Sequence, residues 1–448
     1  QSVICIMDRL DAEPRVLLDP NTLSDDGTVA LTSYEVSPDG KLMAYGLSSG
    51  GSDWQEWRIR NVETGQDLDD HLKWIKFSSV SWTGDGKGFY YSRYAEPGDG
   101  NLMQDINQAQ KVYFHQAGSS QETDRLAYER PEYPDWIVNG TVTEDGAMLI
   151  LHIVKGTSTS NAVFYQDLSR RKSPVVEFLL QFDARYDFVG KEGNTLWFLT
   201  DLEAPRGRLI EINLANPVRD AWKTVVPESG DTLESVRFIN HRFVCTYMKD
   251  ASSLVRIFDR SGIPEEEIGL PGLGSVEGFS GRAGDSETFY SFSSFTVPPA
   301  VYRYDFKTSS SELFRKPELD FNPEDFETKQ VFCSSKDGTR VPIFITSRKG
   351  IKMNNQNPTL LYGYGGFNIS ETPSFSVSRL VWMERGGVFA LANLRGGGEY
   401  GEEWHQSGMK LKKQNVYDDF ISAAEWLIQN GYASRKTLAI EGGSNGGL

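Results

Sequence analysis

A serine between glycines lies near the last residue of the sequence, in Gly442-Gly443-Ser444-Asn445-Gly446. This spacing is G-x-S-x-G, the pattern of a serine held on a sharp turn that follows a strand. Small residues are required beside it because the strained backbone would drive larger side chains into one another. The pattern predicts that Ser444 is a nucleophile for acyl transfer and that the backbone N–H of Asn445 faces the oxyanion. An ordinary glycine-rich connection is the alternative.

An earlier glycine-rich segment can supply the second oxyanion donor. Tyr362-Gly363-Tyr364-Gly365-Gly366-Phe367 follows a short apolar run, in the place where such a donor is needed. A tyrosine hydroxyl in this loop can donate a hydrogen bond to a developing oxyanion. The alternative is that both tyrosines are packing residues.

A third glycine cluster, Gly396 to Gly401, matches the dinucleotide fingerprint G-x-G-x-x-G, and Asp418 follows at about the right distance. Three glutamates, Glu399 among them, crowd the place where a pyrophosphate needs positive potential. The next helix is expected to begin only near Val416. The sequence therefore does not predict a nucleotide site.

No histidine stands where a general base is expected. In hydrolases with this serine motif, the acid and then the histidine follow the serine, and only four residues follow Ser444. The five histidines are His71, His115, His152, His241 and His405. His405 is the nearest, but it precedes the serine in an expected loop and is not expected to be catalytic; structural roles are the better expectation for the other four.

The elements that must position these residues are short apolar strands and one helix. The expected strands are 359–362, 388–392 and 437–440, continuous apolar runs typical of strands buried on both faces of a mostly parallel sheet. A hairpin is predicted around Lys336-Asp337-Gly338. Apolar residues at helical spacing between Val416 and Ile428 predict a helix, and Asn430-Gly431 ends it. Strand, helix and strand in this order indicate an α/β domain.

Residues 1 to about 320 follow a different pattern, in which a turn is followed by an alternating apolar strand. The turns are centred near positions 39, 85, 145, 192, 240 and 285, about 45 to 60 residues apart. This period is typical of four-stranded propeller blades, and six of them can be counted. A pair of β-sandwiches is the alternative.

Composition limits the classes of partner. Acidic residues outnumber basic ones by 62 to 46, a net charge of −16, which disfavours nucleic acid and anionic membranes. The cysteines, Cys5, Cys245 and Cys333, are far apart and lack metal-ligand spacing, so neither a disulfide framework nor a zinc site is expected. A reducing compartment, the cytoplasm, is the expected location. No apolar stretch approaches 18 residues.

Four segments together resemble the prolyl oligopeptidase family of serine peptidases: LLYGYGGFNIS, LANLRGGGEYGEEWH, KQNVYDDFISAAEWLI and EGGSNGGL. The stretches LLDPNTLSDDGTVAL and AYGLSSGGSDW are similar to its propeller, so the resemblance covers the whole chain. It implies an all-β seven-bladed propeller with an incomplete first blade at 1–322. The first half of an α/β-hydrolase domain would follow at 323–448.

The resemblance also implies an activity, cleavage of short peptides on the carboxyl side of proline, with the propeller as a size filter. By motif, Ser444 is the nucleophile, the Asn445 N–H and the Tyr364 hydroxyl form the oxyanion hole, and Phe367 borders the proline pocket. No cofactor or metal is implied. The expected partners are short proline-containing peptides, without nucleic acid or membrane, and the protein is expected to be a monomer.

In the family the catalytic aspartate and histidine lie beyond the serine, so the chain is expected to be a fragment truncated at both ends. The 448 residues alone are then expected to be inactive. Two other functions remain open. One is another serine hydrolase on the same scaffold, an acylpeptide hydrolase or an esterase. The other is a catalytically dead propeller that acts as a binding module.

Overall fold

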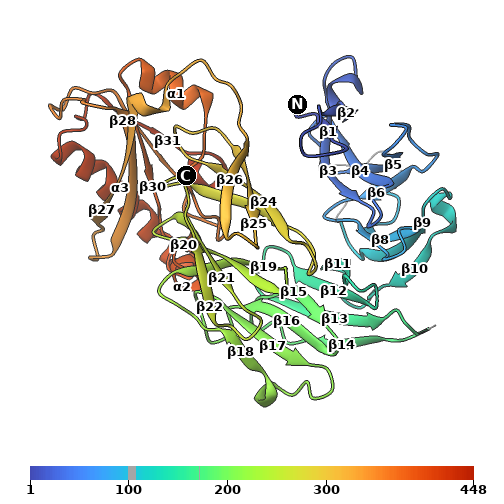
Figure 1. Cartoon of the computed structure of the whole chain (residues 1–448). Coiled ribbons are helices and arrows are strands. Elements are labelled where there is room, and N and C mark those ends of the chain that lie inside the picture. Colours follow the sequence, from blue (N-terminus) through green and yellow to red (C-terminus); the bar gives the residue numbers. More distant parts are fainter. Residues whose placement is uncertain (99–106, 171) are drawn as a thin grey trace. The chain divides into compact units, whose positions relative to one another are not determined.

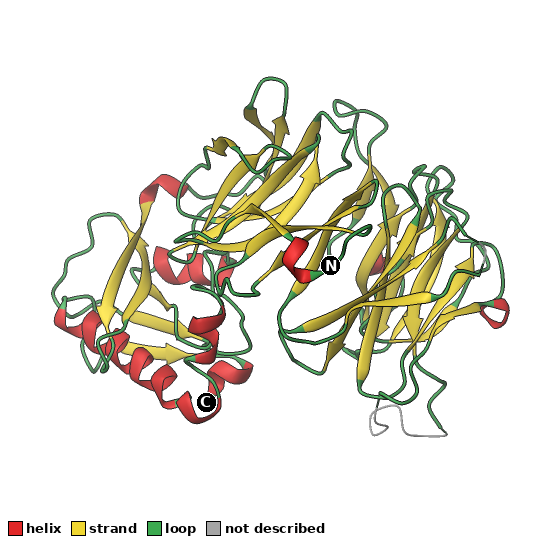
Figure 2. Ribbon diagram, turned by 90° about the horizontal axis from the view of Figure 1, so that it is seen from below, coloured by secondary structure: helices red, strands yellow, loops and turns green. Residues whose placement is uncertain are grey.

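The computed structural model describes residues 1–98, 107–170 and 172–448. The chain divides into two compact units, Gln1–Asp187 and Phe188–Leu448. Short strands dominate most of the chain, and the α-helices all follow residue 376 (Figures 1 and 2). In the described part, no helix is long and apolar enough to cross a membrane.

Six four-stranded sheets follow one another along the chain, and in each the strands pair in sequence order with their neighbours. We call them blades 1 to 6. Blade 1 comprises β3 (Val29–Val36), β4 (Leu42–Ser49), β5 (Gln55–Asn61) and β6 (Leu72–Ile75). Blade 2 comprises β7 (Ser81–Trp82), β8 (Gly88–Arg93), β9 (Lys111–Gln116) and β10 (Arg125–Tyr128). Blade 3 comprises β11 (Trp136–Val142), β12 (Met148–Lys155), β13 (Asn161–Asp167) and β14 (Val175–Leu179). Blade 4 comprises β15 (Tyr186–Glu192), β16 (Thr195–Thr200), β17 (Arg208–Asn213) and β18 (Lys223–Val226). Blade 5 comprises β19 (Thr232–Ile239), β20 (Arg242–Lys249), β21 (Ser252–Phe258) and β22 (Pro264–Ile268). Blade 6 comprises β23 (Ser275–Ser280), β24 (Glu287–Ser293), β25 (Ala300–Asp305) and β26 (Ser310–Arg315).

The prediction of seven blades is wrong. The described chain forms six four-stranded blades, and the residues before them form a separate two-stranded sheet of β1 (Ile4–Ile6) and β2 (Arg15–Leu18). Among the described residues, these strands of three and four residues pair only with each other, which does not make a four-stranded blade. The six turn signals in the sequence, in contrast, correspond one to one to the six blades.

Each turn signal joins the first strand of a blade to the second. In blade 1, the carboxylate of Asp39 accepts hydrogen bonds from the Ser37 hydroxyl (2.8 Å) and from the Lys41 backbone N–H (3.2 Å). Asp85 does the same in blade 2, with the hydroxyl of Thr83. The hydrogen bond from the hydroxyl is the largest cause, and together these bonds lower the pKa of Asp39 and of Asp85. A hydroxyl residue two positions before Asp-Gly is therefore a sharper sequence signal for a blade than Asp-Gly alone.

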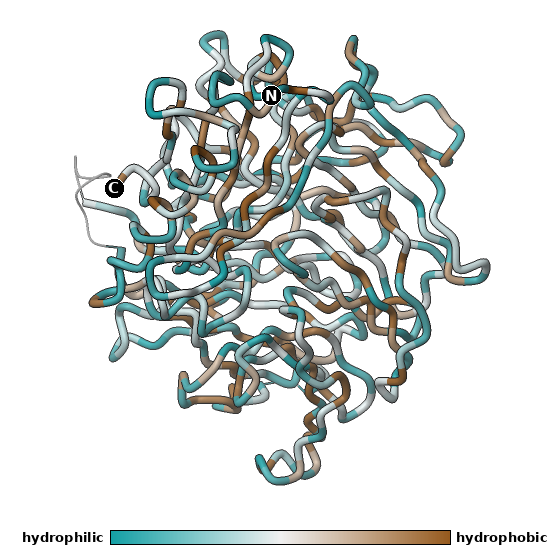
Figure 3. Tube along the Cα trace, turned by 90° about the vertical axis from the view of Figure 1, so that its left-hand side faces the viewer, coloured by the Kyte–Doolittle hydropathy of each residue, from teal (hydrophilic) through white to brown (hydrophobic). Residues whose placement is uncertain are grey.

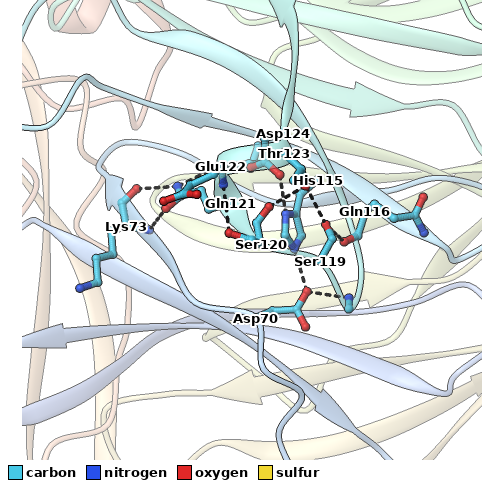
Figure 4. A network of polar contacts seen from close by, with 12 residues as sticks. Asp70, Lys73, His115, Gln116, Ser119, Ser120, Gln121, Glu122, Thr123 and Asp124 are labelled. Atoms are coloured by element: carbon cyan, nitrogen blue, oxygen red, sulfur yellow. Dashed lines mark hydrogen bonds and ion pairs between the residues drawn. The ribbon is translucent and has the colours of Figure 1, made fainter.

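A buried histidine links blade 1 to blade 2. His115, on β9, has no exposed side-chain surface, and its two ring nitrogens lie 2.8 Å from Asp70 and 2.6 Å from Asp124 (Figure 4). The Tyr91 hydroxyl also donates to Asp124, at 2.6 Å. Burial by itself would lower the pKa of His115, but the two carboxylates outweigh it and raise the pKa to about 9. The imidazolium between two carboxylates thus joins the segment before β6 to the outer strands of the next blade.

A five-stranded sheet follows the blades, in the order β27-β28-β30-β29-β31, with β29, β30 and β31 parallel. Its strands are β27 (Phe326–Ser334), β28 (Arg340–Arg348), β29 (Thr359–Gly363), β30 (Val388–Ala392) and β31 (Leu438–Glu441). The helices are α1 (Val377–Glu384), α2 (Glu402–Gln406) and α3 (Gln414–Gln429). The 3-10 turns are η1 (Pro20–Thr22), η2 (Gln121–Thr123), η3 (Arg219–Ala221), η4 (Pro323–Asp325), η5 (Lys410–Lys412) and η6 (Ser444–Gly447).

The sheet buries both faces at β30, as its continuous apolar run predicts. Ala390 and Ala392 share a hydrophobic cluster with Leu427 of α3. Phe389 and Leu391 share another with α1. The predicted helix and hairpin are confirmed as α3 and as β27 with β28. In the hydropathy colouring of Figure 3, apolar and polar segments alternate at short intervals along the chain.

The prediction that 437–440 is a buried strand is wrong in one respect. A strand is present, β31, but among the described residues it pairs only with β29. It is therefore an edge strand, and the Ile440 side chain is 67% exposed.

We predict that the contribution of His115 to stability disappears at high pH. The pKa of His115 is about 9 in the folded protein and about 6.5 in the unfolded chain. The bound proton therefore makes its full contribution to stability below pH 6.5. That contribution, about 3 kcal/mol, is lost as the pH rises through 9. Urea unfolding should show that His115→Gln is strongly destabilised at pH 6 and much less so at pH 10.

The matched control is His71→Gln, because His71 pairs with Glu56 but keeps part of its side chain exposed. We expect only a small effect from it at either pH. A free-energy difference between wild type and His115→Gln that stays constant from pH 6 to pH 10 would contradict the assignment.

Candidate active site

Ser444 occupies a strained turn at the end of β31. Its φ of 50° lies in the left-handed region, which residues other than glycine seldom adopt. Such a conformation persists only where the surrounding structure imposes it, and it is common where a side chain must be presented for chemistry. The serine is exposed and begins the short turn η6. The local geometry, an exposed serine with a positive φ directly after a strand, matches the turn that the serine motif predicts.

The flanking glycines allow two backbone segments to come very close. A Cβ on Gly442 would collide with the carbonyl oxygen of Gly446. A Cβ on Gly446 would lie 2.6 Å from the carbonyl oxygen of Gly363. The first contact closes the turn around Ser444, and the second presses it against the end of β29. Any side chain at these positions would force the turn apart.

Strand register places the tyrosine loop beside this turn. In the parallel pair β29 and β31, Tyr362 lies opposite Glu441, so the chain leaves both strands at the same edge. The Asn445 side-chain Nδ2 then donates to the carbonyl oxygen of Tyr364 at 2.9 Å. Asn445 and Tyr364 are therefore in direct contact, and Ser444 is next to Asn445 in the chain.

Phe367, the last of the predicted site residues, has no hydrogen bond or ring contact with Ser444, Tyr364 or Asn445 among the described residues. It is 59% exposed and has a φ of 54°. A cavity of about 380 Å³ lies behind the serine turn, and its lining includes Tyr364 and Asn445 but neither Ser444 nor Phe367.

His405 lies in α2 rather than in a loop, and it is buried. Its Nδ1 is 3.0 Å from the backbone nitrogen of Asn368 and 2.9 Å from the carbonyl oxygen of Gly396. Depending on its tautomer, this nitrogen either accepts from the Asn368 N–H or donates to the Gly396 carbonyl, and it lies between the loops that follow β29 and β30. The buried ring therefore helps to hold these two loops together.

The Gly396 to Gly401 segment packs against the loop that follows β29. A Cβ on Gly397 would lie 2.8 Å from the carbonyl oxygen of Ile369, and a Cβ on Gly398 would lie 2.8 Å from that of Asn368. These glycines therefore permit contact between two loops. A helix does open after Gly401, contrary to the expectation, but α2 has only five residues.

An ion pair that sequence reasoning missed fixes the start of this segment. Arg395 and Asp419 are both buried, and the Arg395 guanidinium donates to the Asp419 carboxylate at 2.6 Å. Arg395 also contacts Asp337 in the β27–β28 hairpin, at 2.5 Å. Burial by itself would lower the pKa of Arg395, but its hydrogen bonds to Asp419 and Asp337 outweigh burial and raise that pKa. Removing one partner of a buried ion pair of this kind strongly destabilises the folded protein, because the other charge is left buried and unpaired.

A buried carboxyl group joins the two loops further along. Glu399 is 1% exposed, and its Oε1 accepts hydrogen bonds from the Glu371 backbone N–H (3.0 Å) and from Asn393 Nδ2 (3.2 Å). Its other oxygen, Oε2, is buried without a partner among the described residues. Burial raises the pKa of Glu399 to about 7, so the neutral acid predominates below pH 7.

Comparisons with known proteins identify the family of the chain. Residues 1–317 match the family described as "Prolyl oligopeptidase, N-terminal beta-propeller domain", and residues 373–448 match "Prolyl oligopeptidase family". The chain belongs to the prolyl oligopeptidase family. The first of these matches covers most of the chain, so membership does not depend on the serine motif alone.

Named relatives cover nearly all of the chain. A prolyl endopeptidase from Elizabethkingia meningoseptica is 40% identical over 445 residues, 99% of this chain and 63% of the relative. A prolyl endopeptidase from Dictyostelium discoideum is 36% identical over 96% of this chain and 63% of its own length. The chain thus spans less than two thirds of the length of these prolyl oligopeptidase relatives.

Solved structures show the same fold. A structure from a study of two prolyl endopeptidases superposes with a TM-score of 0.91 at 38% identity, over 98% of this chain and 64% of that one. Prolyl oligopeptidase B from Galerina marginata, bound to a 35-residue hydrolysis and macrocyclization substrate, also gives a TM-score of 0.91. The identity is 32%, over 97% of this chain and 62% of that one.

We predict that Glu399 makes stability depend on pH near neutrality. A carboxyl pKa of about 7 in the folded protein, above its ordinary value, means that the folded state holds this proton more tightly than the unfolded state. Stability is therefore greatest at low pH on this account and falls as the pH rises from about 4.5 to 7. Glu399→Gln, which stays neutral, should unfold at a higher temperature than wild type at pH 8 and near the same temperature at pH 5.

Glu403→Gln in α2 serves as the control, because Glu403 is exposed. It should not change the pH dependence of melting. A Glu399→Gln variant that is less stable than wild type at pH 8 would show that the buried carboxylate is not destabilising, which would contradict the raised pKa.

Proposed function

We propose that this chain carries the nucleophile and the oxyanion hole of a serine endopeptidase that cleaves short peptides on the carboxyl side of proline. The observation that carries the proposal is the left-handed Ser444 turn, held against the Tyr364 loop by glycine contacts. The prolyl endopeptidases among its relatives support the choice of peptide bond.

The proposed chemistry is acyl transfer. The Ser444 Oγ attacks the prolyl carbonyl carbon and loses its proton to a general base, while the carbonyl π electrons move onto the oxygen. The backbone N–H of Asn445 and the hydroxyl of Tyr364 would stabilise that oxyanion. The intermediate collapses to an ester at Ser444 with loss of the protonated amine, and water then hydrolyses the ester.

The remaining assignments are part of the same proposal. Phe367 would border the proline pocket, where its exposed ring can pack on a pyrrolidine. The propeller would occupy 1–322 and limit substrate size, and the partial hydrolase domain would occupy 323–448. The free thiols of Cys5, Cys245 and Cys333 suit a reducing compartment such as the cytoplasm.

Ser444→Ala tests the proposal, in the protein expressed from its whole coding sequence. We expect hydrolysis of an acyl-Gly-Pro nitroanilide to fall by about 10⁴-fold or more, since removal of the nucleophile leaves only residual catalysis. The measurement is kcat by release of nitroaniline. Acyl-Gly-Ala nitroanilide and a simple nitrophenyl ester are measured alongside, to establish which bond is preferred.

Ser378→Ala, an exposed serine in α1, is the matched control and should retain full activity. Turnover that survives Ser444→Ala would overturn the nucleophile assignment. A preference for the ester or for alanine over proline would overturn the proposed specificity and favour another hydrolase of the same scaffold.

A further inference from the structure

Lys413 contacts both segments of the proposed oxyanion hole. It lies between η5 and the first turn of α3, and its side chain is half-buried. The Nζ donates to the carbonyl oxygen of Gly365 at 2.9 Å and to the side-chain Oδ1 of Asn445 at 3.1 Å. One ammonium group therefore joins the loop after β29 to the turn after β31.

The Asn445 side-chain amide hydrogen-bonds both to Lys413 and to the loop after β29. Its Oδ1 accepts from Lys413, which leaves its Nδ2 to donate to the carbonyl oxygen of Tyr364 at 2.9 Å. An amide with the opposite orientation would place its NH₂ against the ammonium and its oxygen against a carbonyl. Lys413 thus fixes the orientation of this side chain, and two consecutive carbonyls, those of Tyr364 and Gly365, are held.

The contacts of Lys413 differ from those of the other buried cation nearby. Arg395 is neutralised by two carboxylates, whereas both hydrogen-bond acceptors of Lys413 are neutral oxygens. Burial lowers the pKa of Lys413, so its position has an electrostatic cost. A point charge on a flexible stem, with three donors, suits the joining of carbonyls that approach from different segments.

We infer that Lys413 is a positioning residue for the oxyanion hole, which sets the distance between the Tyr364 hydroxyl and the Asn445 backbone N–H through its bonds to Gly365 and Asn445. The inference rests on the proposed function, because the hole matters only if Ser444 is acylated. Lys413 does not touch substrate in this scheme. Its effect is to hold two donors at fixed positions before charge develops on the substrate.

The experiment compares Lys413→Met with Lys412→Met, in the protein expressed from its whole coding sequence. Lys412 is an exposed neighbour in the same run and undergoes the same substitution. We expect Lys413→Met to lower kcat about 10- to 100-fold with KM changed less than about 3-fold, because loss of one whole oxyanion donor costs about 10²–10³. Lys412→Met should match wild type, and Lys413→Arg, which can still donate to both oxygens, should retain more activity than Lys413→Met.

A pair of inhibitors separates oxyanion binding from ordinary binding. An acyl-Gly-Pro aldehyde reacts with Ser444: the Oγ–C bond forms as the Oγ proton passes to the general base, the carbonyl π bond breaks, and the former carbonyl oxygen enters the hole. The corresponding alcohol cannot react. We expect Lys413→Met to weaken inhibition by the aldehyde about 10-fold or more and inhibition by the alcohol less than about 3-fold.

The outcomes separate this inference from the proposed function. If Ser444→Ala is inactive but Lys413→Met keeps the wild-type kcat, with or without a change in KM, the inference is wrong and the proposed function stands. If Ser444→Ala remains active, both fail. If Lys413→Met does not fold, Asn445→Ala serves instead, because it removes the hydrogen bonds from Lys413 and to Tyr364 at their other end. We expect it to weaken inhibition by the aldehyde much more than inhibition by the alcohol. Equal weakening of both would overturn the inference.

Discussion

The close approach of two turns at one edge of the sheet is the constraint on which the rest of the site depends. Because β29 and β31 are parallel neighbours, the chain emerges from both at the same place. Backbone must then pack on backbone, and a Cβ on Gly446 would lie only 2.6 Å from the carbonyl oxygen of Gly363. Glycine at these positions, and a left-handed conformation at Ser444, follow from that packing.

Polar groups, more than regular structure, hold the surrounding loops. The segments after β29 and β30 contain little helix, yet their ends are tied to α3 and to each other by buried charges and by the Glu399 acid. Arg395 anchors one loop to Asp419 on the buried face of α3, and Lys413 anchors the other from the start of the same helix. The helix thus positions both loops from one side of the sheet.

Local patterns in the sequence predicted local structure well. Helical spacing located α3, an uninterrupted apolar run located β30, and the turn signals gave six blades. The serine motif gave a turn with the expected geometry at Ser444. The count of seven blades came from family resemblance instead, and the first residues form only a two-stranded sheet.

Long-range pairing was beyond the reach of these patterns. Asp419 falls on the apolar face of a helix, and its partner Arg395 is 24 residues away. Lys413 stands in a run with two other lysines, and nothing in that run distinguishes it before the loops are folded together. Glu399 suggests a surface charge in sequence, but in the structure it is a buried carboxyl group with a raised pKa.

The most direct test of the account is to locate the acylated residue. An acyl-Gly-Pro phenyl phosphonate reacts when a nucleophile attacks phosphorus and phenol leaves, so the modified residue can be found by mass spectrometry of peptides from the inactivated enzyme. The account predicts a single phosphonyl group on Ser444. Complete inactivation with the phosphonyl group on any other residue, and none on Ser444, would contradict it.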